Sequence, residues 1–191
     1  FEDIAIEKDI KYLFLSPKNK IDAWFDNDKI EKILYNLLSN AFKFTPNGKG
    51  ITVSIEKETV NNEDYAIIKV IDFGIGIPKE ELVSIFERFY QTRRENNAIH
   101  EGSGLGLSYI KRLVEIHKGV INIESEFHKG TTCTLTVPIS KIAYSDNSII
   151  ELQPQKYDFK YTKIGVDVIK ENQLMSKTPI KSVKEHSKET P

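Results

Sequence analysis

The sequence predicts an α/β domain in which helices pack on a sheet, and three patterns lead to this prediction. Apolar residues recur at the helical period from Ile30 to Ala41, which is typical of a long amphipathic helix. Residues 51–58 alternate like a half-buried strand, and residues 65–72 have the continuous apolar character of a buried one. A second helical pattern is followed by two alternating segments, residues 120–125 and 131–139, which predict another strand pair.

The elements at the start of the chain are expected as follows. Residues 11–16 and 21–26 are short and rich in apolar side chains, and the turn-forming segment between them predicts a strand pair. Asp28 and Glu31 have the spacing of a capping box, so we expect the long helix to begin there. Pro46 and the glycine after it end this helix.

The second half of the chain begins with a predicted short helix after Pro78. Its apolar side chains would be Leu82, Ile85, Phe86 and Phe89. A polar segment and three glycines follow, and the next helix is expected to end at Gly119. The α/β domain would therefore occupy residues 1–140, and residues 141–191 would be a C-terminal extension or a linker.

Composition sets the broad class of this 191-residue chain. Hydrophobic residues make up 39% and charged residues 29%, as in an ordinary soluble domain. The net charge of -1 gives no reason to expect nucleic acid or an anionic membrane as a partner. Cys133 is the single cysteine, which excludes an internal disulfide and fits a reducing cytosol. Since the chain begins at Phe1 and its one methionine is Met175, we expect it to be part of a longer protein.

Three polar residues lie on one side of the long predicted helix. Asn36, Asn40 and Lys43 are four and three residues apart, beside the apolar stripe. They could simply form a solvated face. Alternatively, an amide oxygen could bind a hard cation such as Mg²⁺ while the lysine meets phosphate.

The segment DFGIGIP, residues 72–78, ends a buried strand with an acid. Its glycines and proline alone would explain a tight turn. An acid at the end of an apolar strand is costly to bury unless it is paired, however. Asp72 could accept a hydrogen bond from an amino group such as that of adenine, and Gly74 and Gly76 would let the backbone approach the ring.

The segment HEGSGLGL, residues 100–107, is a third candidate site. It has neither the third glycine of a dinucleotide-binding fingerprint nor the lysine of a P-loop. It does place glycine backbone at the start of a helix, where free N–H groups favour an anion. A phosphate-binding role is therefore expected, although glycine-rich loops are common.

Together, NLLSNAFKFT, DFGIGIP, IFERFYQ and GSGLGLS occur in the order and spacing of the N, G1, F and G2 boxes of sensor histidine kinases. The chain from about Ile4 to Ser140 resembles their ATP-binding catalytic domain, a member of the GHKL superfamily. The resemblance implies a Bergerat-type fold, in which helices cover one face of a mixed sheet. It also implies ATP and Mg²⁺ as ligands, bound under a lid that runs from about Gln91 to Glu101.

The resemblance assigns a role to each matching position. Asn40 would hold Mg²⁺, with Asn36 beside it and Lys43 at the phosphates, and these three are the expected catalytic residues. Asp72 would bind adenine, Phe86 and Phe89 would hold the lid, and Thr131 or Thr132 would support the base. The full set expected to contact nucleotide is Asp72, Gly74, Gly76, Ile77, Arg88, Phe89, Gly102, Ser103, Gly104, Leu105, Gly106, Leu107, Thr131 and Thr132.

One difference from related ATPases and two departures from the family pattern affect this interpretation. Related ATPases have a water-activating glutamate where this chain has Asn36, and an amide cannot act as a general base, so a kinase is favoured. Gln91 replaces a common arginine, for which Arg88, Arg93 or Arg94 could substitute. Cys133 replaces a common phenylalanine on the last strand.

The phosphoacceptor histidine is expected on a separate dimerisation helical domain upstream of this chain. His117 would cap a helix, and none of His100, His128 and His186 has the context of an acceptor. The expected partners are that helical domain, a second copy of the full-length protein and a response-regulator receiver domain, which residues 141–191 could connect to this domain in one chain. The resemblance places the domain in the cytoplasmic part of a membrane-anchored sensor. Two alternatives are a degenerate nucleotide-binding scaffold and a serine-directed relative.

Overall fold

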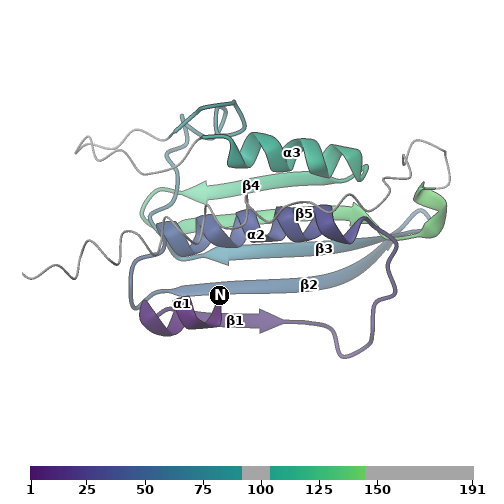
Figure 1. Ribbon diagram of the computed structural model, residues 1–191, viewed down its shortest axis with the longest axis horizontal. Helices are drawn as coiled ribbons and strands as arrows, with labels where there is room; N and C mark the ends of the chain where they lie inside the picture. Colours follow the sequence, from purple (N-terminus) through teal and green to yellow (C-terminus); the bar gives the residue numbers. More distant parts are fainter. Residues whose placement is uncertain (92–103, 145–191) are drawn as a thin grey trace, which may run out of the picture. The chain divides into compact units, whose positions relative to one another are not determined.

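The computed structural model describes residues 1–91 and 104–144, which form one sheet with helices on a single face (Figure 1). The strands are β1 (Lys11–Leu15), β2 (Gly50–Val60), β3 (Glu63–Asp72), β4 (Val120–Glu126) and β5 (Gly130–Pro138). Their order across the sheet is β1-β2-β3-β5-β4. Strand β1 pairs with β2 in parallel and the other pairs are antiparallel, so the sheet is mixed, as the sequence predicts.

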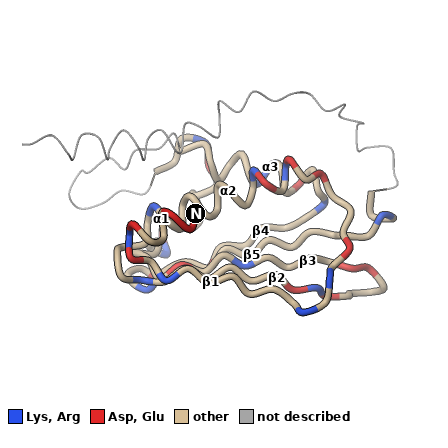
Figure 2. Tube along the Cα trace, turned by 60° about the horizontal axis from the view of Figure 1, so that its bottom comes forward, with Lys and Arg blue, Asp and Glu red and all other residues tan. Residues whose placement is uncertain are grey.

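The helices are α1 (Glu2–Glu7), α2 (Asn27–Phe44) and α3 (Gly106–Ile116), and a short 3₁₀ turn, η1 (Lys141–Tyr144), follows β5. Figure 2 shows that α2 and α3 lie on the same side of the sheet. The apolar stripe of α2 is buried against the sheet, with Ile33 and Leu37 at 0% and 2% exposure. Buried residues from alternate positions of β3 and β5 complete this core, including Val70 and Leu135.

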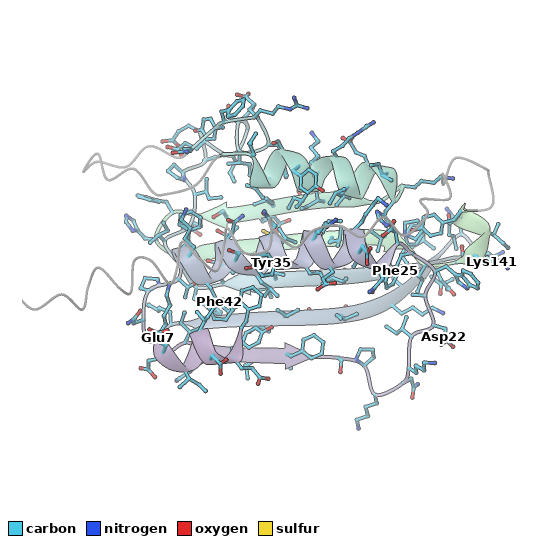
Figure 3. The ribbon with its side chains drawn as sticks, in the orientation of Figure 1. Glu7, Asp22, Phe25, Tyr35, Phe42 and Lys141 are labelled. Atoms are coloured by element: carbon cyan, nitrogen blue, oxygen red, sulfur yellow. The ribbon has the colours of Figure 1, made fainter. Side chains whose placement is uncertain are left out.

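Helix α1 closes the core beside β1. The Phe1 ring stacks on Phe42 with 5.2 Å between centroids and lies 5.4 Å from the Tyr35 ring. Figure 3 shows Tyr35 and Phe42 on the part of α2 that lies above α1 and β1. Lys8 Nζ also donates to the carbonyl oxygen of Phe42 at 2.8 Å, which ties α1 to the last turns of α2.

The prediction of a strand pair at residues 11–16 and 21–26 is wrong in its second half. Only residues 11–15 form a strand, and they pair with β2, which follows α2 in the sequence. A parallel pair requires a crossover rather than a hairpin, and α2 supplies it. Residues 21–26 instead lead into α2, held by a hydrogen bond from the Trp24 N–H to the Ile139 carbonyl.

Two smaller predictions are also wrong. Helix α2 begins two residues earlier than the capping box indicates, because Asp26 is the N-cap and its Oδ1 accepts from the Lys29 N–H at 3.1 Å. The segment after Pro78 forms successive turns rather than a helix. Only Ile85 of its apolar side chains is fully buried and Val83 is 84% exposed, so the segment has too little apolar contact to stabilise a helix.

The end of α3 agrees closely with the sequence. The helix proper ends at Ile116, and the Gly119 N–H closes the last turn on the Val114 carbonyl. His117 is the C-cap residue, 3% exposed, and its Nδ1 lies 2.8 Å from the Leu113 carbonyl oxygen. The capping role predicted for His117 is thus confirmed.

Candidate functional site

The predicted site residues gather where β3 ends, β5 begins and α3 starts. On α2, Asn40 Nδ2 donates to Asn36 Oδ1 at 3.3 Å, and both side chains are half-buried. Because Asn40 uses its amino group in this bond, its amide oxygen remains available to bind a cation. Lys43 lies one turn further, exposed, with its Nζ 5.1 Å from the centre of the Phe44 ring.

Gly106 brings the glycine segment against this asparagine pair. A Cβ atom on Gly106 would lie 2.8 Å from Asn36 Nδ2 and 2.9 Å from Asn36 Oδ1, so any other residue at this position would have to displace the Asn36 amide. Helix α3 begins at Gly106, and its N-cap residue, Leu105, offers no side-chain capping bond. The first turn of α3 therefore has N–H groups without a side-chain cap and starts beside Asn36, a suitable place for an anion.

Gly104 joins the glycine segment to the residues before the predicted lid. Its φ of +66° is left-handed, and a Cβ atom there would lie 2.6 Å from the Phe89 carbonyl carbon. The Phe89 N–H donates to the Gly104 carbonyl at 2.9 Å. Phe89 and Arg88 are exposed, whereas Leu107 packs partly against the core. The structure thus brings the N, F and G2 boxes together.

Asp72 is buried at the end of β3, with 8% of its surface exposed. Its Oδ1 accepts from the Gly74 N–H at 2.9 Å, and the backbone of Thr131 also donates to the carboxylate. Burial raises the pKa of Asp72 to about 6, although these two hydrogen bonds oppose the rise. The carboxylate is therefore largely ionised at pH 7 and can accept further hydrogen bonds.

The two candidate threonines lie on opposite faces of the sheet. Thr131 pairs with Asp72 in the β3–β5 ladder, so both side chains are on the face that carries the helices. Thr132 pairs with Ile71 and lies on the other face. Cys133 is back on the helix-bearing face, and burial together with the charge of Asp72 raises the pKa of its thiol to about 12. Of the two threonines, the fold places Thr131 with Asp72.

The loop after Asp72 is attached to the turn between β4 and β5. Gly76 has a φ of +65°, and a Cβ atom there would lie 2.1 Å from the Glu126 carbonyl oxygen. The Ile77 N–H donates to Ser125 Oγ at 2.8 Å, and the His128 N–H donates to the Ile75 carbonyl at 2.7 Å. Sequence reasoning missed Ser125. The signal was its place opposite Thr131 in the predicted strand pair.

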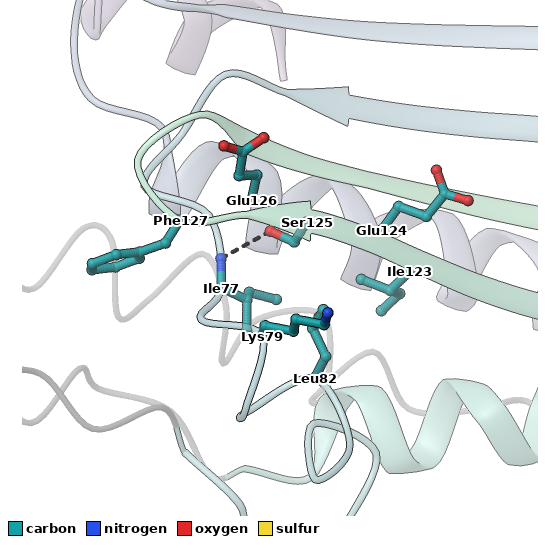
Figure 4. A pocket seen from close by; sticks show the side chains of 8 residues that line it. All are labelled: Ile77, Lys79, Leu82, Ile123, Glu124, Ser125, Glu126 and Phe127. Carbon is teal, nitrogen blue, oxygen red and sulfur yellow. Dashed lines mark hydrogen bonds between the residues drawn. The ribbon is translucent and has the colours of Figure 1, made fainter.

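An open cavity of about 580 Å³ lies between β4 and residues 77–82. Figure 4 shows Ile77, Leu82 and Ile123 around it, and the dashed line marks the Ile77–Ser125 hydrogen bond. Asn36, Asn40 and Asp72 do not line this cavity. Of the residues expected to contact nucleotide, the cavity is lined by Ile77 alone.

Several expected site residues lie outside the described part of the chain, namely Gly102, Ser103, Arg93, Arg94 and His100. Within residues 1–91 and 104–144, no group of three or more His, Cys, Asp and Glu side chains could hold a metal ion. A Mg²⁺ ion bound mainly by phosphates and water needs no such group, and one amide oxygen fits it. In the same ranges, no helix has the length and apolar character needed to cross a membrane.

The comparison with protein families identifies the domain. A family model described as "Histidine kinase-, DNA gyrase B-, and HSP90-like ATPase" matches residues 25–141, more than half of the chain. The chain belongs to this family. The matched range contains all four boxes, from Asn36 to Ser108, and also Thr131 and Thr132.

Curated relatives place the chain in the histidine kinase branch. Hybrid signal transduction histidine kinase D of Dictyostelium discoideum is 37% identical over 166 residues, which cover 82% of this chain and 11% of that protein. Sensor histidine kinase WalK of Bacillus subtilis is 38% identical over 137 residues, which cover 71% of this chain and 22% of that protein. The chain thus spans only 11–22% of the length of these relatives. It is a histidine-kinase-type ATP-binding catalytic domain.

Solved structures agree on the fold. The nucleotide-free catalytic domain of histidine kinase ThkA is 26% identical, with a TM-score of 0.61, and the match covers 75% of this chain and 88% of that one. Full-length ShkA in complex with AMPPNP is 25% identical with a TM-score of 0.61, and the match covers 72% of this chain and 27% of that one. The predicted α/β fold of histidine kinase catalytic domains is confirmed.

Proposed function

We propose that this domain holds Mg²⁺-ATP and presents it for phosphoryl transfer to a histidine on a separate dimerisation helical domain. The observation that carries the proposal is the contact of Gly106 with Asn36, whose amide in turn bonds Asn40. This contact puts the N–H groups of a helix start beside a pair of amide side chains. Such a combination suits a polyphosphate with its metal ion.

Each residue then has a distinct task. Asp72 accepts a hydrogen bond from the adenine amino group, with Gly74 and Gly76 lining the base and Thr131 beside it. Asn40 supplies an oxygen ligand to Mg²⁺, Asn36 orients Asn40, and Lys43 neutralises phosphate charge. When bound, Mg²⁺ would offset the negative charge of the phosphate oxygens. Phosphoryl transfer requires mainly positioning and charge neutralisation, and these residues supply both.

Transfer to a protein side chain is favoured over hydrolysis. At the position where related ATPases carry a water-activating glutamate, this chain has Asn36, and an amide cannot take a proton from water. His117 is not a suitable acceptor, because it is 3% exposed and bonded to the Leu113 carbonyl. His128, the other described histidine, is exposed in the turn between β4 and β5 and lacks the helical context of an acceptor. We therefore propose that the acceptor lies on the separate helical domain.

The wider setting of the domain is also a proposal. The relatives include a hybrid signal transduction histidine kinase, and that match covers 82% of this chain, which is more than residues 1–140 alone provide. This supports a parent protein with its own receiver domain. We place the domain in the cytoplasmic portion of a dimeric, membrane-anchored sensor.

Titration calorimetry with ADP and with AMPPNP, each with and without Mg²⁺, tests the proposal. We expect binding that weakens about 100-fold in Asp72→Asn and whose Mg²⁺ dependence changes in Asn40→Asp. A supplied helical domain carrying a histidine should then be phosphorylated by ATP in the presence of the wild-type chain. Failure to bind nucleotide under all conditions would leave a degenerate scaffold. Transfer to serine rather than histidine would point to a serine-directed relative.

A further inference from the structure

Ser125 lies at the junction of the two backbone segments that border the Asp72 site. One segment is the loop of residues 73–77, and the other is the turn that joins β4 to β5. Ser125 Oγ accepts from the Ile77 N–H at 2.8 Å, lies 2.9 Å from the Gly130 carbonyl oxygen and is 2.9 Å from Thr131 Oγ1. The hydroxyl therefore has three partners in two elements that are far apart in sequence.

The chemistry of these partners fixes the direction of each hydrogen bond. A hydroxyl has one proton to donate and two lone pairs that accept. The Gly130 carbonyl can only accept, so it receives the Ser125 proton, and the Ile77 N–H occupies one lone pair of Ser125. The second lone pair then accepts the proton of the Thr131 hydroxyl. Toward any further partner, Thr131 can act only as an acceptor.

Thr131 is the cross-strand neighbour of Asp72 on the same face of the sheet. The ionised carboxylate of Asp72 also acts only as an acceptor. Two acceptors thus lie side by side at this end of the site. An exocyclic amino group, with two N–H donors, satisfies both of them, whereas a carbonyl oxygen at the same place on the base would be repelled.

From this arrangement we infer that Ser125 is a positioning residue that makes the site select adenine over bases with a carbonyl group at that position. It acts through Thr131, whose hydroxyl it orients, and through Ile77, which it fixes beside the base. The inference rests on the proposed function, since it concerns the specificity of the same nucleotide site.

The test compares binding of ATP with binding of inosine triphosphate, in which a carbonyl replaces the amino group. Calorimetry of the whole chain would use wild type, Ser125→Ala, Ser125→Thr and Thr131→Val. In Ser125→Ala we expect ATP affinity to fall about tenfold while inosine triphosphate affinity changes less than about twofold. Thr131→Val should lower the ratio of ATP affinity to inosine triphosphate affinity in the same way. Ser125→Thr, which keeps the hydroxyl, should preserve this ratio.

Ser84→Ala is the matched control, because it removes a serine hydroxyl that bonds Glu87 at the surface. It should leave both affinities unchanged. If Ser125→Ala only loosened the fold, the affinities for ATP and inosine triphosphate would fall by the same factor. An unchanged ratio of the two affinities in Ser125→Ala and Thr131→Val would overturn the role of Ser125 but not the proposed function. If wild type bound neither nucleotide, the proposed function would fall as well.

Discussion

The two ends of the sheet are joined in different ways: the end that carries Asp72 has the tightest backbone contacts, and the other end adds side-chain hydrogen bonds to its backbone contacts. At the Asp72 end, a Cβ atom on Gly76 would lie 2.1 Å from the Glu126 carbonyl oxygen, and one on Gly130 would lie 2.0 Å from that of Asp72. At the opposite end, the Tyr144 hydroxyl bonds the Pro138 carbonyl at 2.6 Å, and Lys118 Nζ bonds the Ala143 carbonyl at 2.8 Å.

This difference indicates where the molecule tolerates change. Backbone segments in direct contact leave no room for a side chain, so a substitution there must move the loop or the turn that forms the site. A side-chain hydrogen bond can be removed one group at a time, and the loss is confined to that bond. The glycines at the site end should therefore respond steeply to substitution, and the side chains that bond backbone at the opposite end should respond gradually.

The largest effect is expected for Gly76→Ala. The new Cβ would overlap the Glu126 carbonyl, and the φ of +65° is unfavourable for alanine, so the free energy of unfolding should fall by about 3 kcal/mol or more. Urea unfolding followed by circular dichroism measures this. Gly48→Ala is the control, because Gly48 has a φ of +80° with no atom within 4 Å of its Cβ position. It should cost only about 1 kcal/mol, and equal costs would mean that the Glu126 contact does not matter.

Asp72→Asn should change binding and stability in opposite directions. An amide that accepts from Gly74 and Thr131 turns its own amino group toward that of adenine, so ATP affinity should fall about 100-fold. Since burial raises the pKa of Asp72 from 3.8 to about 6, removing its charge should stabilise the fold at pH 7 by about 3 kcal/mol. Calorimetry and thermal unfolding of the same sample would check both signs. A loss of stability would contradict the burial argument.

The same carboxyl group predicts a pH dependence. The folded state binds the proton more tightly than the unfolded chain, so the destabilising contribution of Asp72 is absent below pH 3.8 and complete above about pH 6. Nucleotide binding needs the ionised form. ADP affinity should therefore fall below pH 6, by about tenfold at pH 5. Asp72→Asn should lack this titration, and a profile shared by both proteins would assign it to another group.

The candidate site was more predictable from sequence than the elements around it. Asp72, Gly76 and Gly106 stand in short motifs whose chemistry is local: an acid ending a strand, and glycines where backbone approaches backbone. The partners in those contacts are distant in sequence, and no local pattern identifies them. Ser125 was missed for this reason, since its role depends on the register of β4 against β5 and on the path of residues 73–77.

The errors in secondary structure have the same origin. Residues 21–26 are as rich in apolar side chains as a strand, but they do not pair with β1, because β1 takes β2 as its parallel partner. Residues 79–88 have helical spacing but bury little apolar surface. In both cases the tertiary contacts that each segment makes or lacks determined its structure, and not its local sequence pattern.

Gly106→Ala should affect binding while leaving the fold intact. Alanine is the better helix former, so stability should hold or rise by a few tenths of a kcal/mol. The new methyl group would displace the Asn36 amide, which bonds Asn40, and Mg²⁺-ATP affinity should fall about tenfold. In an Asn36→Ala background the amide is already absent, so Gly106→Ala should add little. Additive losses would show that Gly106 acts independently of the asparagine pair.

The smallest effect is expected at the opposite end of the sheet, for Tyr144→Phe. The Tyr144 hydroxyl lies 2.6 Å from the Pro138 carbonyl and 3.3 Å from that of His117, and burial raises its pKa to about 12, so it stays a donor at ordinary pH. Removing it should lower the free energy of unfolding by about 1 kcal/mol and leave nucleotide affinity unchanged.

Tyr65→Phe provides the comparison for Tyr144→Phe, because its hydroxyl bonds the Glu63 side chain at the same end, where water can replace it. Its cost should be a few tenths of a kcal/mol. Urea unfolding and ATP calorimetry on both variants measure the difference. A change in ATP affinity for Tyr144→Phe would mean that the two ends of the sheet are coupled through α3 and β5. The ends would then differ in how they are joined but not in whether they affect nucleotide binding.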